Sequence, residues 1–194
     1  MKRVCVYSGS NLGARPEYKR LAVQLGDLFV QQNIELVYGG SRIGLMGELA
    51  NRILERGGSV TGVMPANLFP KELVHTRLSR LIEVNSMHER KQTMADLADG
   101  FIALPGGVGT YEELFEMLSW SQLGIHHKPI GLLNADNFFE PLLSLLQHTI
   151  QEGFMNDSNM KLLLVASEPA NLLNLMSQYT PPVLDIKWRE LNRA

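Results

Sequence analysis

The feature that most constrains the fold of this chain is a repeated alternation of short apolar runs with amphipathic stretches of helical period. The apolar runs predicted as strands are Val4–Tyr7, Ile34–Tyr38, Val60–Met64, Leu81–Val84, Phe101–Leu104, Pro129–Leu133 and Leu162–Val165. Helices are predicted from Pro16, from Gly44 to Arg56, and over Met87–Ala98, Thr110–Leu123, Phe138–Glu152 and Glu168–Ser177. Parallel strands need helix-length crossovers. We therefore predict an α/β chain with a Rossmann-like doubly wound, mostly parallel sheet and helices on both faces.

Length and composition predict one domain covering residues 1–194. A chain of 194 residues with 45% hydrophobic and 20% charged residues can bury a substantial core without disulfides or structural metals. The dipeptide Pro181-Pro182 should end regular structure and leave residues 181–194 as an irregular C-terminal tail.

Charge and targeting features argue against polymeric or membrane partners. The net charge of −2 provides no general attraction to nucleic acid or to anionic lipid. The basic start Met1-Lys2-Arg3 is followed by too short an apolar run for a signal peptide, and no run reaches membrane-spanning length. The single cysteine, Cys5, lies in an expected buried strand and has no disulfide partner. We therefore expect a cytoplasmic protein.

Three glycine-containing turns follow predicted strands: Ser8–Asn11, Gly39–Gly47 and Pro105–Thr110. In doubly wound sheets, ligands bind outside the carboxyl ends of the strands, near the point where strand order reverses. All three turns are therefore candidates for the binding site. The stretch from Pro65 to Ser79 lacks clear periodicity and is predicted to be a long connection that reaches over a neighbouring site.

The third turn has the features of a phosphate-binding loop. Gly106, Gly107 and Gly109 stand between a strand and a helix, where backbone N–H groups and the helix N-terminus attract anions. The alternative is that these glycines only permit a tight turn. Neither a P-loop nor a full dinucleotide-binding pattern is present.

Three charged residues each allow two interpretations. Glu113 follows Thr110 at capping-box spacing, so it either caps the helix or is a carboxylate that stabilises a cationic sugar. Arg90 and Lys91 stand early in a helix, where the helix dipole disfavours cations, so they either bind an anion or form a solvated face offset by Glu89. The pair His126-His127 has no matching ligand spacing around it, and we expect no metal site.

The motif Pro105-Gly106-Gly107-Val108-Gly109-Thr110-Tyr111-Glu112-Glu113 resembles the PGGxGTxxE signature of the LOG ("lonely guy") family, the cytokinin riboside 5′-monophosphate phosphoribohydrolases. The resemblance extends through the segments at residues 38–47, 87–91 and 101–104, and it covers nearly the whole chain. It implies a Rossmann-like homodimer that uses no metal or organic cofactor. It also implies that a nucleoside 5′-monophosphate is cleaved to ribose 5-phosphate and a free base: adenine, an N6-isoprenoid adenine or another purine.

Carried over residue by residue, the resemblance places the catalytic arginine and glutamate at Arg90 and Glu113. The substrate-binding positions that we expect are Gly9, Ser10, Gly39, Gly40, Glu72, Met87, Lys91, Gly106, Gly107, Val108, Gly109, Thr110 and Ser119. The chain departs from many relatives at Ser41, where they have a third glycine. It also follows the family less clearly over residues 68–84, a segment that includes Glu72.

Other activities fit the residues less well. A nucleotide or cofactor carrier of related fold would use the same glycine loop without cleaving its ligand, and the retention of both Arg90 and Glu113 argues against it. A dinucleotide-dependent oxidoreductase needs an acidic residue at the end of the second strand, which instead ends at Tyr38-Gly39. Relatives have been labelled lysine decarboxylases, but the sequence shows no setting for the pyridoxal cofactor that such a reaction normally needs.

Overall fold

The computed structural model describes residues 1–66 and 73–183, and its centre is a seven-stranded sheet in the order β4-β3-β2-β1-β5-β6-β7. The strands are β1 (Arg3–Tyr7), β2 (Glu35–Tyr38), β3 (Val60–Pro65), β4 (Arg80–Val84), β5 (Gly100–Ala103), β6 (Ile130–Leu133) and β7 (Leu163–Ala166). All neighbouring strands pair in parallel. The predicted fold class is confirmed, and the sheet is entirely rather than mostly parallel.

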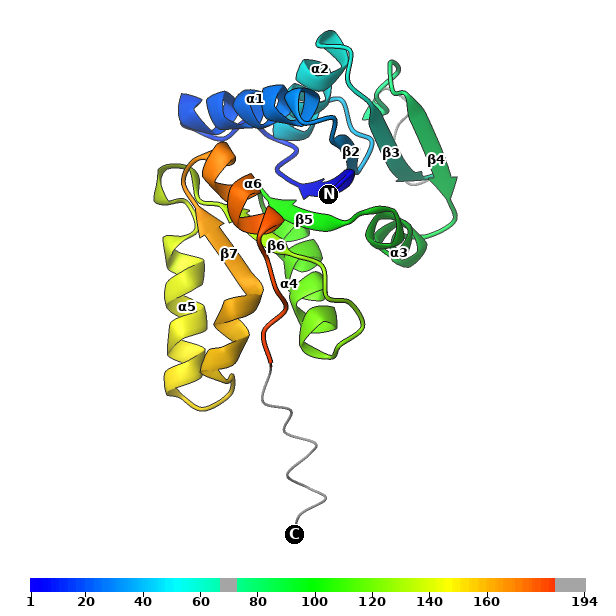
Figure 1. The fold of residues 1–194 in the computed structure, drawn as a ribbon. Helices are drawn as coiled ribbons and strands as arrows, with labels where there is room; N and C mark the ends of the chain where they lie inside the picture. Colours follow the sequence, from blue (N-terminus) through cyan, green and yellow to red (C-terminus); the bar gives the residue numbers. More distant parts are fainter. Residues whose placement is uncertain (67–72, 184–194) are drawn as a thin grey trace.

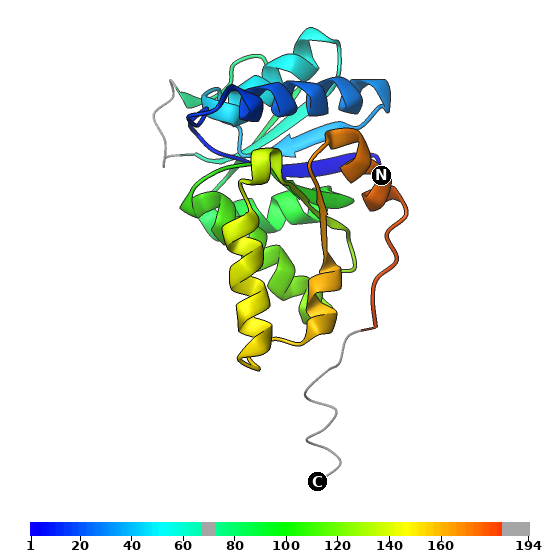
Figure 2. The same cartoon turned by 90° about the vertical axis from the view of Figure 1, so that its left-hand side faces the viewer.

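Helices cover both faces of the sheet. They are α1 (Pro16–Gln31), α2 (Gly44–Glu55), α3 (Met87–Leu97), α4 (Val108–Gln122), α5 (Glu140–Gln151) and α6 (Pro169–Ser177). Helices α1, α2 and α6 lie on one face, and α3, α4 and α5 lie on the other (Figure 1). The perpendicular view in Figure 2 shows the same two layers on either side of the strands. Short 3₁₀ segments, η2 (Ala135–Asn137) and η3 (Asp157–Leu162), precede α5 and β7.

The central strand β1 shows why the inner strands are mainly apolar. Successive side chains of a strand point to opposite faces. Val4 and Val6 accordingly join the core under α1, α2 and α6, whereas Cys5 and Tyr7 join the core under α3, α4 and α5. A strand that is covered on both faces has no solvent-facing position, so alternation is lost and an apolar run remains.

The start of α4 differs from its predicted position at Thr110. Gly107 has an extended backbone (φ −102°, ψ −154°) and is the N-cap residue, so the helix begins at Val108. Thr110 is therefore the third helical residue, and Glu113 lies a full turn inside the helix. No side chain caps this helix. The interpretation of Glu113 as part of a capping box with Thr110 is wrong.

The connection between β3 and β4 is described from residue 73 onward, and that part packs against the second glycine turn. The N–H of Arg42 donates to the Leu73 carbonyl at 2.9 Å, and the N–H of His75 donates to the Gly40 carbonyl at 2.9 Å. Glu72 lies outside the described residues. No helix in the described part of the chain has the length and apolar character that crossing a membrane requires.

Candidate active site at the carboxyl edge of the sheet

The strand order reverses between β1 and β5, and the loops that follow these two strands are in direct contact. The N–H of Gly9 donates to the Pro105 carbonyl at 3.0 Å. A Cβ on Gly106 would lie 2.1 Å from Thr110 Oγ1 and 2.9 Å from Gly9 N. Glycine at 106 is therefore needed for the packing of the two loops. For this one position, the alternative interpretation of the glycines as a tight turn applies.

Gly107 and Gly109 are different, because a Cβ at either position would meet no atom within 4 Å. Neither has a positive φ. The protein's own packing therefore does not require glycine at these two positions, whereas close approach of a ligand to the backbone would. The N-terminus of α4, which lacks a side-chain cap, presents N–H groups here. Between the two glycines the side chain of Val108 is 83% exposed. The loop therefore leaves backbone N–H groups at a helix N-terminus accessible, as the predicted phosphate-binding role requires.

A buried ion pair joins α3 to α4 beside this loop. Arg90 Nη1 lies 2.9 Å from Glu113 Oε1, and the two side chains are 10% and 11% exposed. Arg90 Nε also donates to the Val63 carbonyl at 3.1 Å, which fixes the guanidinium against β3. Burial raises the pKa of Glu113 above its ordinary value, and the charge of Arg90 opposes that rise. The carboxylate is thus both a stronger base than an exposed glutamate and firmly oriented.

The second glycine turn forms the wall behind Arg90. A Cβ on Gly39 would lie 2.1 Å from Arg90 Nη2, so only glycine leaves room for the guanidinium. The neighbouring Gly40 has φ +80°, a left-handed conformation that favours glycine. Of these two predicted binding positions, Gly39 shapes the site directly, whereas Gly40 is favoured by its own backbone conformation.

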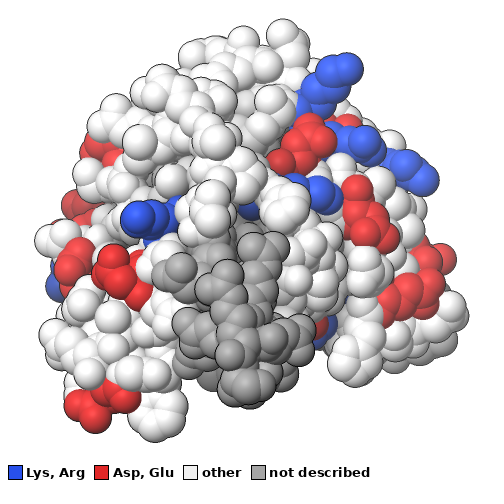
Figure 3. All heavy atoms as spheres, turned by 60° about the horizontal axis from the view of Figure 1, so that its bottom comes forward, with Lys and Arg blue, Asp and Glu red and all other residues white. Residues whose placement is uncertain are grey.

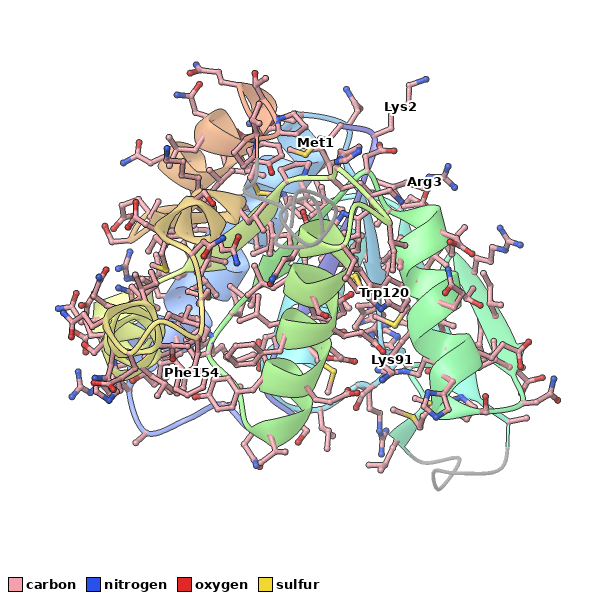
Figure 4. All side chains as sticks on the ribbon, turned by 90° about the horizontal axis from the view of Figure 1, so that it is seen from below. Met1, Lys2, Arg3, Lys91, Trp120 and Phe154 are labelled. Atoms are coloured by element: carbon pink, nitrogen blue, oxygen red, sulfur yellow. The ribbon has the colours of Figure 1, made fainter. Side chains whose placement is uncertain are left out.

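A second ion-pair cluster lies next to the first and was missed from the sequence. Lys91 Nζ contacts Glu112 Oε1 and also lies 3.1 Å from Glu116 Oε1. Figure 4 shows Lys91 in the space between α3 and α4. Arg90 and Lys91 are both buried, so their interpretation as a solvated face is wrong. Their ion-pair partners come from α4, whereas the Glu89 carboxylate accepts from the Asn85 N–H. The i, i+4 spacing of Glu112 and Glu116 was a signal that they share a helix face.

The remaining predicted residues that the structure describes have different surroundings. Ser10 is exposed, and its backbone packs so closely on Gly44 that a Cβ there would clash with it. Met87 is the first residue of α3 and is half-buried. Ser119 lies further along α4 and lines an apolar hollow of about 120 Å³ with Phe115 and Met160 among others.

The histidine pair has a structural explanation at its first member. One ring nitrogen of His126 is 3.0 Å from the Met117 carbonyl, and the ring packs against Phe101. Within residues 1–66 and 73–183, no three His, Cys, Asp or Glu side chains cluster as metal ligands would.

On the face drawn in Figure 3, acidic and basic side chains are interspersed and neither sign forms one continuous field.

Fold and site together define a class of protein: a Rossmann-like α/β protein with an open glycine loop at a helix N-terminus and a buried arginine–glutamate pair near its switch point. Residues 46–176 match the family described as "Possible lysine decarboxylase". The chain belongs to the LOG family of cytokinin riboside 5′-monophosphate phosphoribohydrolases, as the resemblance of its motifs indicated.

The similarity to individual relatives covers most of both chains. The probable cytokinin riboside 5′-monophosphate phosphoribohydrolase LOGL1 of Oryza sativa subsp. japonica is 48% identical, over 92% of this chain and 80% of its own. The enzyme named cytokinin riboside 5′-monophosphate phosphoribohydrolase LOG2 of Arabidopsis thaliana is 43% identical, over 93% of this chain and 84% of its own.

Solved structures confirm the fold. The molybdenum cofactor binding protein of Rippkaea orientalis has a TM-score of 0.68 at 24% identity, covering 91% of this chain and 96% of its own. The Moco carrier protein of Chlamydomonas reinhardtii has a TM-score of 0.68 at 21% identity, covering 91% of this chain and 95% of its own. At these identities the likeness bears on the fold alone.

Proposed function

We propose that this protein hydrolyses the N-glycosidic bond of adenosine 5′-monophosphates, including N6-substituted ones, and releases the free base and ribose 5-phosphate. The observation that carries the proposal is the buried Arg90–Glu113 pair beside a glycine loop that is open toward a ligand. The names of relatives that are 41–48% identical support the same reaction.

The phosphate is the anchor of the substrate in this proposal. The N–H groups from Gly107 to Thr110, at the positive end of α4, bind the 5′-phosphate and place the ribose over the carboxylate of Glu113. Binding energy from the phosphate then orients the reacting sugar. A nucleoside without the phosphate should accordingly be a poor substrate.

Glu113 acts on the bond that breaks. The C1′–N bond cleaves through an oxocarbenium-like state, and the carboxylate stabilises the positive charge on the sugar. It also orients the water whose oxygen bonds to C1′ and accepts a proton from that water. This proton then passes to the departing base, which leaves with it in place of the sugar and regenerates the carboxylate. Arg90 keeps the buried carboxylate ionised and oriented until the substrate arrives.

We further propose that the protein acts in the cytoplasm as a homodimer. Four large apolar side chains are exposed around the C-terminal halves of α4 and α5: Phe115, Leu123, Ile125 and Phe154. Leu123 and Ile125 are each 62% exposed, and Phe154, labelled in Figure 4, is 81% exposed. Such a group of apolar side chains is typical of an interface. The buried free thiol of Cys5 suits a reducing compartment.

The decisive experiment incubates the protein with several nucleoside 5′-monophosphates, and with adenosine as the matched control that lacks only the phosphate. Free base and ribose 5-phosphate are followed together and should appear in equal amounts. Glu113→Gln should bind the nucleotide but lose at least about 100-fold in kcat. Binding without release of base from any nucleotide would instead identify a carrier.

A further inference from the structure

The ion pairs between α3 and α4 form two adjacent cross-links rather than one. Arg90 and Lys91 are consecutive on α3, and they contact the consecutive residues Glu113 and Glu112 on α4. Lys91 also contacts Glu116, one turn further along. The ammonium charge of Lys91 is thus already balanced by two carboxylates, and its side chain is only 7% exposed.

We propose that Lys91 is a positioning residue for the Arg90–Glu113 pair. Lys91 affects the reaction through Glu113 and does not itself touch the substrate. This inference rests on the proposed hydrolase function of the same site. It gives Lys91 a different role from the substrate contact that the family resemblance implies.

The geometry gives the first reason. A single ion pair between two helices limits their separation but leaves each helix free to rotate about its axis. Two pairs from consecutive residues on each helix limit the rotation as well, because consecutive helical residues point about 100° apart. Lys91 therefore helps to hold the Arg90 guanidinium against the Glu113 carboxylate.

Electrostatics gives the second reason. The charged and titratable groups that act on or lie around Glu113 are Arg90 and Lys91 from α3, Glu112 and Glu116 from α4, and Cys5 and Tyr7 from β1. Lys91 lowers the pKa of Glu113, and Glu112 raises it. Glu116 Oε2 is buried and has no hydrogen-bond partner within the described residues, so Lys91 is the cation that balances this carboxylate.

Removal of the Lys91 charge should therefore appear in the pH profile. In Lys91→Met, Glu112 and Glu116 are unbalanced beside Glu113, so the pKa of Glu113 rises. The acid limb of kcat/KM should move upward by about one pH unit, with rates converging on wild type at higher pH. Lys91→Arg keeps the charge and should restore the limb. Lys19→Met removes a lysine that pairs with Glu48 on the opposite face, and it should leave the limb in place.

A second readout does not depend on activity. The carboxyl carbon of Glu113, assigned by its absence in Glu113→Gln, can be titrated by ¹³C NMR in wild type and in Lys91→Met. We expect a higher midpoint in Lys91→Met. We expect a lower midpoint in Glu112→Gln, because this change removes a like charge beside Glu113. If Lys91→Met does not fold, Glu112→Gln still tests whether the neighbouring charges set the pKa of Glu113.

Failure of the proposed role of Lys91 and failure of the proposed hydrolase function give different results in these experiments. An unchanged acid limb and an unchanged NMR midpoint in Lys91→Met, with KM raised at every pH, would show that Lys91 contacts the substrate and would overturn the inference. A wild-type protein that releases no base would refute the proposed function. The NMR titration would still decide whether Lys91 controls the ionisation of Glu113.

Discussion

Replacing Gly39 with alanine tests whether the second glycine turn acts through Arg90. The added Cβ would lie 2.1 Å from Arg90 Nη2 and 3.3 Å from Cζ, and real Cβ contacts essentially never fall under 3.0 Å. The backbone of Gly39 does not have a positive φ, so alanine introduces no backbone strain of its own. The guanidinium must therefore move, and it should lose at least one of its hydrogen bonds to Val63 and Glu113.

The expected magnitudes follow from those contacts. Loss of one hydrogen bond to a charged group costs about 1.5–3 kcal/mol. The smaller entropy of the unfolded alanine chain offsets about 0.4–1 kcal/mol of this cost. The free energy of unfolding should thus fall by about 1–2 kcal/mol, which lowers Tm by about 2–8 °C in a domain of this size. A misplaced Arg90–Glu113 pair should reduce kcat/KM by about 100-fold or more.

The assay combines thermal denaturation with initial rates of base release from adenosine monophosphate. Ser41→Ala is the matched control, because it lies in the same turn and loses only a 3.4 Å contact between Oγ and the Ile43 N–H. Its kcat/KM should stay within about twofold of wild type. If Gly39→Ala kept both wild-type Tm and kcat/KM within about threefold, Arg90 would not need its observed position, and our account of the turn would be refuted.

Three further perturbations test other parts of the structure. Gly107→Ala should raise KM for the nucleotide at least about tenfold without lowering Tm, because the added Cβ meets only the space assigned to the ligand. Asp99→Ala should lower Tm at pH 7. Burial acts to raise the pKa of Asp99, but the N–H groups of Arg3 and Lys2 lower it below its ordinary value, so the carboxylate stabilises the fold above that value. The difference in Tm should disappear as pH falls through the lowered pKa. Leu123→Glu should shift the protein from dimer to monomer in light scattering, and an unchanged mass would exclude this surface from the interface.

The strands were predictable from sequence to within one or two residues because burial on both faces makes the inner strands predominantly apolar. The predicted run Val4–Tyr7 and the observed strand Arg3–Tyr7 differ by one residue. The beginning of α4 was predicted less well. Gly107 can serve as an N-cap in an extended conformation, whereas Thr110 is the residue type that normally caps. The general preference for threonine at N-caps therefore did not predict this helix start, because the packing of the loops sets the backbone conformation at Gly107.

For the site, the sequence identified residue types but not their contacts. Arg90 and Glu113 were both recognised, yet 23 positions separate them, and no local pattern says that they meet. Glu112 and Glu116 were not singled out because charged residues on a helix are normally solvated. Only the packing of α3 against α4 brings these carboxylates into contact with the buried Lys91.

By itself, the sequence determined the class of fold, the three glycine turns and the family, because these follow from periodicity and from motifs that are local in the chain. The tertiary structure decided which turns form the site, since only the sheet order brings the ends of β1 and β5 together. It also decided that Glu113 pairs with Arg90 rather than capping α4, and that Gly39 leaves space for the Arg90 guanidinium. These properties depend on distance and burial, which arise only when separate segments pack together.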